Sequence, residues 1–259
     1  VKSTTGLNLT TSQKENLVKE INPYKLASIT PVIVDPHTTF IILGITFNYN
    51  SSATTQSKTD LETSVSNTIA SFTDNNLEDF NLPFRHSLVT GLIDDVDSAV
   101  TNNTTTVTMG KFFKPSLTTS TNYTVSFNNA FYNPHSGHNS SGGGVIASTG
   151  FQIDGDTSTE YFFDEDGSGN LRTYSIVSGT RTYLNSTAGS VDYANGIVTI
   201  NALKITAVSN IDGETSTTIR MTAIPSSNDI VPVRNQLLEL DLVNTTITGL
   251  VDNTTTTGV

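Results

Sequence analysis

Residues 31–115 limit the possible folds of this chain more than any other stretch of the sequence. Apolar and polar residues alternate over positions 45–50, a pattern that is typical of a strand with one buried face. We therefore predict an extended segment over residues 33–50. A second apolar alternation near the end of the stretch predicts a return strand over residues 104–113.

Two helices are predicted between these strands. The first covers residues 60–72, because Leu61, Val65, Ile69 and Phe72 are spaced so that they share one helix face.

The second helical pattern covers residues 82–100, and Pro83 suits its first turn. The buried face of the second helix is expected to consist of Phe84, Leu88, Leu92 or Ile93, and Val96.

A lead-in helix is predicted over residues 9–21. Thr10, Thr11 or Ser12 can cap it, and Ser12 and Glu15 have the spacing of a capping box.

The chain as a whole is predicted to be an α+β protein of two parts. After residue 116, short strands alternate with turn signals, which is typical of a mostly antiparallel sandwich or small barrel. We expect an α+β module over residues 1–115, a β-rich domain over 116–243 and a Thr/Asn-rich tail over 244–259. Because the sequence starts at Val1 without an initiator Met, we expect it to be the later part of a longer polypeptide or a processed one.

The charge balance argues against several classes of function. Asp and Glu number 24 against 13 Lys and Arg, which gives a net charge of −11. A surface that follows nucleic-acid phosphates needs clustered basic residues, and no basic run occurs. No apolar run approaches the ~18 residues of a membrane span, and the absence of Cys excludes disulfides and thiolate metal sites. We expect no nucleic acid, membrane or small-molecule substrate as a partner, and no cofactor.

One segment has the spacing of a calcium-binding loop. Calcium prefers several converging oxygen ligands, and the first half of such a loop supplies them from alternate residues. The twelfth position, however, is Ser175 rather than Glu, and the flanking residues favour strands. An acidic, Gly-rich β-turn is therefore the favoured interpretation, with a cation site as the alternative. The candidate ligands are Asp164, Asp166, Ser168 and Asn170.

Two carboxylates of the second predicted helix could form a catalytic pair. Asp94 and Asp97 share a helix face and would repel each other unless they are screened, with Arg85 and Lys111 as possible partners. A solvated or interface-facing acidic patch is the favoured interpretation. The sequence also lacks a Gly-x-Ser-x-Gly motif and a Cys nucleophile, so we expect no enzyme activity.

Several segments resemble a known family, the baseplate wedge proteins of contractile-tailed bacteriophages. The order of helix, extended segment, strand and two helices is similar to the baseplate J-like module, and residues 9–240 resemble the C-terminal half of the large wedge subunit. The motifs that carry the resemblance are Ser28–Pro36, Gly44–Tyr49, Phe84–Leu88, Ile93–Asp94, Val107–Lys111, Phe127–His135, Ser148–Phe151, Gly189–Tyr193, Asn195–Gly196 and Asp229–Gln236.

The resemblance implies a structural role rather than chemistry. Such proteins pair into homodimers and contact other wedge and hub proteins in a ring that holds the baseplate together and relays the contraction trigger. The implied location is the tail baseplate of a virion, assembled in the host cytoplasm. Its contact surface is expected on the helix faces of the first module, near Arg85, Leu88, Asp94 and Asp97.

A different class of function stays open at this point. A β-rich module whose loops carry Tyr and Asn could bind a receptor or a glycan on a virion or cell surface. Exposed aromatic side chains at Phe131–Tyr132 and Tyr161 would favour that alternative, because aromatic rings stack on sugars.

Overall fold

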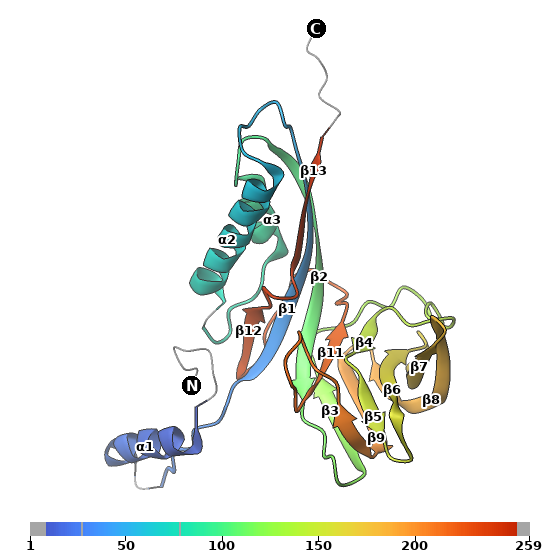
Figure 1. Cartoon of the computed structure of the whole chain (residues 1–259). Coiled ribbons are helices and arrows are strands. Elements are labelled where there is room, and N and C mark those ends of the chain that lie inside the picture. Colours follow the sequence, from blue (N-terminus) through green and yellow to red (C-terminus); the bar gives the residue numbers. More distant parts are fainter. Residues whose placement is uncertain (1–8, 27, 78, 253–259) are drawn as a thin grey trace.

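The computed structural model describes residues 9–26, 28–77 and 79–252. Two β-sheets form the body of the molecule, two α-helices lie against the first sheet, and a third helix stands apart (Figure 1). The class is therefore mixed α+β with a large antiparallel sheet, as the sequence predicts. Within the described residues, no helix is long and apolar enough to cross a membrane.

The first sheet is built around the long strand β1. On one side, β1 pairs antiparallel with β2 over most of its length. On the other side, two C-terminal strands lie parallel to β1, β12 along its first half and β13 along its second. Strands β11 and β4 extend the sheet beyond β2. The bounds are β1 (His37–Tyr49), β2 (Val100–Phe113), β4 (Ile146–Ser148), β11 (Ile219–Ala223), β12 (Gln236–Leu240) and β13 (Thr246–Val251).

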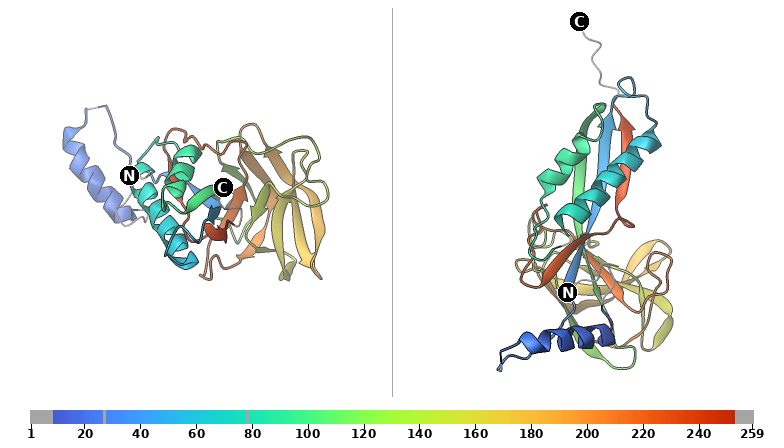
Figure 2. Two further views of the ribbon diagram at one scale, coloured as in Figure 1. Left: turned by 90° about the horizontal axis from the view of Figure 1, so that it is seen from above. Right: turned by 90° about the vertical axis from the view of Figure 1, so that its left-hand side faces the viewer.

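Helices α2 (Lys58–Asn76) and α3 (His86–Asp94) cover one face of the β13–β1–β2 part of this sheet (Figure 2). Ser57 caps α2. Its hydroxyl oxygen accepts a hydrogen bond from the backbone N–H of Asp60, and the carboxylate of Asp60 accepts one from the backbone N–H of Ser57. The α2 stripe predicted from spacing is buried against alternate residues of β1, as one apolar core: Ile41, Leu43, Ile45, Phe47, Leu61, Val65, Ile69 and Phe72.

The second helix of this region differs from the prediction in both of its ends and in its buried face. Phe84 is not helical, because its backbone exchanges two hydrogen bonds with Ile230. The helix begins at His86 and ends at Asp94 rather than at residue 100, and its buried residues are Val89 and Ile93. Leu88, which was expected to be buried, is 55% exposed.

The second sheet has seven strands in the order β10-β5-β6-β7-β8-β9-β3, and every pairing in it is antiparallel. It is one curled sheet rather than two stacked ones (Figure 1). The bounds are β3 (Thr121–Ser126), β5 (Phe151–Ile153), β6 (Asp156–Glu165), β7 (Asn170–Val177), β8 (Thr180–Asp192), β9 (Ile197–Leu203) and β10 (Ile205–Val208).

The C-terminal part of the chain departs from the predicted domain limits. Residues 246–251, which fall in the expected tail, form β13, and residues 253–259 of that tail lie outside the described residues. Strands β4, β11 and β12 come from the expected β-rich domain but belong to the first sheet. A local pattern predicts a strand but not its partner, so the limits at 115 and 243 do not coincide with the sheets.

The lead-in helix α1 (Thr11–Ile21) and the short 3-10 helix η1 (Asn22–Tyr24) stand apart from both sheets (Figure 2). Thr10, one of the three predicted caps, forms the capping box of α1 with Gln13, two residues before the predicted pair. No residue of α1 is buried. The extended segment predicted from residue 33 becomes a strand only at His37.

Candidate functional site

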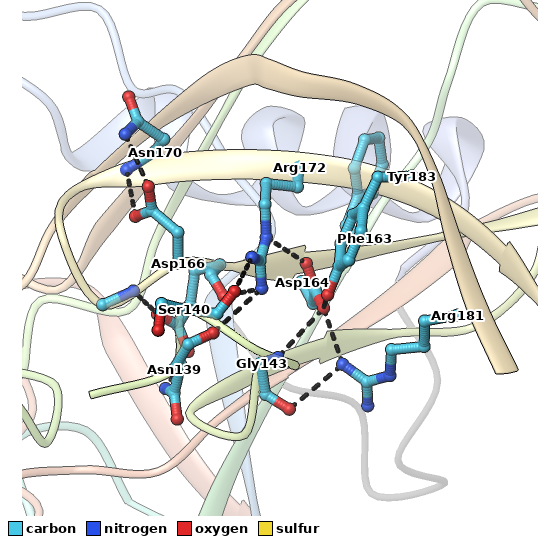
Figure 3. A network of polar contacts seen from close by, with 12 residues as sticks. Asn139, Ser140, Gly143, Phe163, Asp164, Asp166, Asn170, Arg172, Arg181 and Tyr183 are labelled. Carbon is cyan, nitrogen blue, oxygen red and sulfur yellow. Dashed lines mark hydrogen bonds and ion pairs between the residues drawn. The ribbon is translucent and has the colours of Figure 1, made fainter. Parts of the chain in front are cut away.

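The candidate calcium loop lies at the turn between β6 and β7, above a buried polar network (Figure 3). Asp164 is the centre of this network and is 1% exposed. Its Oδ1 accepts a hydrogen bond from Arg172 Nε at 2.9 Å, and its Oδ2 accepts one from Arg181 Nη1 at 2.6 Å. The hydroxyl of Tyr183 and the N–H of Gly143 also donate to Oδ2. Two guanidinium groups thus neutralise a carboxylate that burial would otherwise make costly.

Arg172 joins the β6–β7 hairpin to the loop that precedes β4. Besides Asp164, its guanidinium donates to the carbonyl oxygens of Asn139, Ser140 and Glu165. One planar guanidinium thereby satisfies acceptors from two segments, a geometry that Lys could not reproduce. The side chain holds the loop against the sheet.

Glu165 faces the opposite side of β6 and is fully buried. Its carboxylate accepts hydrogen bonds from Tyr193 Oη at 2.7 Å and Gly167 N at 2.6 Å, and from the backbone of Val145. Burial and this carboxylate raise the pKa of Tyr193. Backbone and hydroxyl donors, rather than an ion pair, therefore stabilise this second charge.

Gly143 explains part of the Gly-rich segment at residues 142–144. A Cβ atom at this position would lie 2.7 Å from the Cβ of Asp164, so no other residue fits without displacing the network. The sequence lacks the basic residue of a phosphate loop here and favours a flexible connector. In the structure the segment packs directly on the hairpin.

Asp166 turns away from Asp164 and stabilises the tip of the hairpin. Its Oδ1 accepts hydrogen bonds from the N–H groups of Ser168 and Asn170, and its Oδ2 accepts one from Asn170 Nδ2. The four candidate calcium ligands are thus not brought together around a common point. Within the described residues, no group of three or more His, Asp or Glu side chains is placed to hold a metal ion.

Aromatic rings complete the polar network on its outer side. The guanidinium of Arg172 lies 4.3 Å from the ring centre of Tyr183, and that of Arg181 lies 4.6 Å from the ring of Tyr174. Desolvation is the main cause that raises the pKa of both tyrosines, so both stay neutral at physiological pH. Each group here is satisfied by its own chain, which is typical of a structural network.

The four predicted contact residues lie on or beside α3. Arg85 forms an ion pair with Asp229 at 2.8 Å, and Asp94 accepts a hydrogen bond from Asn103 Nδ2. Asp97 accepts hydrogen bonds from the backbone of Ala99 and from Gln56 Nε2. The three charged residues therefore contact their own chain, and the two carboxylates do not form a pair. Leu88 is different, because its side chain is an exposed apolar group.

Leu92 extends the exposed apolar surface of Leu88 by one helical turn. It is 41% exposed and borders a groove of 370 Å³ between α2 and α3. The remaining lining of this groove is mostly Thr, Ser and Asn from α2. The outer face of the helix pair thus combines two exposed leucines with uncharged polar side chains.

Sequence reasoning did not single out Arg172, Glu165 or Arg181. The only available signal was the position of adjacent charged residues, Asp164 and Glu165, at the end of an apolar run. Adjacent residues in a strand point to opposite faces, so both charges could be solvated only at an exposed edge. A buried position for both required partners that are distant in sequence.

The comparison with protein-family models concerns the first sheet and the helices α2 and α3. Residues 37–112, which begin with β1 and include all but the last residue of β2, match the family described as baseplate structural protein gp6, C-terminal domain III. Over 108 residues the chain is 32% identical to the baseplate wedge protein gp6 of Enterobacteria phage T4. That alignment covers 42% of this chain and 16% of the T4 protein. Residues 37–112 are therefore similar to one domain of a baseplate structural protein, and the aligned part of the chain spans only a small share of the T4 wedge protein.

Proposed function

We propose that this chain is a structural component of a phage tail baseplate, located in the virion. The observation that carries the proposal is the match of residues 37–112 to a domain of a baseplate structural protein. The described carboxylates are consistent with it, because those of the most buried network are occupied by arginine, tyrosine and backbone donors. Contacts with other baseplate proteins are part of the same proposal.

Within the baseplate, the specific role that we propose for this chain is to form contacts between subunits through α2 and α3. Leu88 and Leu92 are neighbours on the solvent side of α3, and apolar side chains on a helix surface gain free energy when a partner covers them. The segment before β1 offers further exposed apolar side chains, among them Tyr24, Leu26 and Val32. Pairing of two copies, and a relay of the contraction trigger through such contacts, extend the proposal.

Immunogold electron microscopy tests the location. Antibodies raised against the purified chain should label the baseplate end of the tail in intact virions. Label that is absent from virions, or confined to the capsid, would overturn the proposal. Virions that have been stripped of their tails serve as the control preparation.

A further inference from the structure

A cavity of 330 Å³ lies where the end of β2 meets β3 and the turn before β12. Its walls combine hydroxyl, amide, basic and aromatic side chains with no Asp or Glu. The lining residues that bear on its chemistry are His37, Lys111, Thr124, Ser126, Asn128 and Arg234.

Lys111 is the unusual member of this lining. It is 9% exposed, yet the described residues supply neither a hydrogen bond nor an ion pair to its ammonium group. Burial lowers the pKa of Lys111 to about 8, so the side chain is still mostly protonated at neutral pH. An ammonium group that loses much of its hydration without gaining a counter-ion is destabilised, and charges inside proteins are ordinarily paired.

The rim of the cavity adds two more basic groups. His37 at the start of β1 and Arg234 before β12 are both exposed, and their side chains have no partner within the described residues. Asp and Glu outnumber Lys and Arg by 24 to 13 in the whole chain. The lining of this cavity is therefore basic, although the chain as a whole is acidic.

We propose that this cavity is a binding site for a small oxyanion, a carboxylate or phosphate group. Lys111 supplies a positive charge inside the cavity, and Arg234 supplies a planar set of donors at its rim, which suits carboxylate and phosphate oxygens. Thr124, Ser126 and Asn128 offer hydroxyl and amide donors along the β3 side. The volume is at the lower end of the range for small-ligand sites, which favours a compact anion.

Isothermal titration calorimetry on the full chain tests the site. The probes are inorganic phosphate and glutarate, each titrated near neutral pH against chloride at matched ionic strength. The variant is Lys111→Met, which keeps the apolar stem and removes the charge. The matched control is Lys114→Met, because Lys114 is exposed, lies three residues further along and does not line the cavity.

We expect the wild-type protein and Lys114→Met to bind at least one probe with equal affinity, and Lys111→Met to bind it at least roughly tenfold more weakly. Binding of phosphate alone would indicate a free phosphate ligand, and binding of glutarate would indicate a carboxylate. Equal affinity of Lys111→Met and wild type, or no saturable heat with either probe at millimolar concentration, would overturn the proposal. A circular dichroism melt of each variant confirms that it is folded.

Discussion

Among single residues, Asp164 and Lys111 are two mostly buried ionisable side chains with opposite surroundings. Asp164 is surrounded by two guanidinium groups, a hydroxyl and a backbone N–H. Lys111 is also mostly buried, at 9% exposed, but its ammonium group forms no hydrogen bond or ion pair within the described residues. The first arrangement stabilises the fold, whereas the second lowers stability unless a ligand compensates it.

Arg172→Met should destabilise the chain by about 3–5 kcal/mol, because it removes one of the two cations that neutralise Asp164 and the hydrogen bonds to its Oδ1 and to two loop carbonyl groups. Urea denaturation followed by circular dichroism measures this change in the free energy of unfolding. The control is Lys204→Met, which breaks a largely exposed ion pair with Asp154 and should cost below about 1 kcal/mol. Similar losses for both variants would contradict the role given to the buried network.

Lys111→Met should stabilise the ligand-free protein near neutral pH, and the gain should depend on pH. The pKa of Lys111 is about 8 in the folded chain and near 10.5 when unfolded, so folding disfavours its proton. The wild-type protein therefore becomes more stable as pH rises from 8 towards 10.5, by roughly 3 kcal/mol for this shift. His37 and Arg234, the other basic groups that line the cavity, are present in both proteins.

The difference in unfolding free energy between Lys111→Met and wild type should accordingly be largest below pH 8 and shrink above it. Urea denaturation across this pH range measures it, in chloride buffer without oxyanions. A difference that stays constant with pH would contradict the lowered pKa of Lys111.

At the scale of elements, α3 has one buried and one exposed apolar stripe. Val89 and Ile93 face the sheet, while Leu88 and Leu92 face solvent. Each exposed leucine directly precedes a buried residue in the sequence, so the exposed stripe and the buried stripe lie side by side on the helix. A helix that is apolar on two sides is expected where a second partner covers the outer side.

Leu88→Asp should weaken subunit association at least roughly tenfold without unfolding the chain, because an exposed Leu contributes little to the monomer and a charge opposes burial in a contact. Sedimentation velocity over a concentration series measures the association. Leu184→Asp is the matched control, since Leu184 is also 55% exposed but lies on β8. Equal association of both variants would place the contact elsewhere.

Calcium should leave the melting temperature of the chain unchanged. The carboxylate of Asp164 is occupied by guanidinium groups, and that of Asp166 is occupied by backbone and amide donors of the hairpin turn. A thermal melt with millimolar calcium against the same melt with magnesium tests this. A rise with calcium alone would show that the turn can rearrange around a cation.

The elements that sequence predicted best are those whose partners are close along the chain. The spacing of Leu61, Val65 and Ile69 identified α2, and the alternation at Ile45 and Phe47 identified β1. The start of α3 was wrong because Phe84 pairs with a residue 146 positions later, which no local pattern reveals. Long-range pairing also explains why β13 was not foreseen.

At the scale of the molecule, one sheet gathers strands from both ends of the chain. β1 is enclosed by β2 on one side and by the C-terminal strands β12 and β13 on the other (Figure 1). The domain that matches gp6 is therefore completed by strands outside residues 37–112. The buried residues of both sheets also belong to one apolar core. One shared core thus holds the two sheets together.

The two candidate sites differ in how far the sequence alone could predict them. The acidic turn at residues 164–170 was favoured as a β-turn, and the structure places it between β6 and β7. The cavity at Lys111 could not be predicted, because its walls come from β1, β2, β3 and the turn before β12. Only the folded chain brings these basic residues together.

The most direct test of the structural role is an electron cryo-microscopy reconstruction of a baseplate that contains this chain. We expect density for β1, α2, α3 and β2 within the baseplate, with Leu88 and Leu92 covered by a neighbouring subunit. A reconstruction that lacks the chain, or that shows α3 facing solvent with no subunit against it, would contradict the proposed structural role.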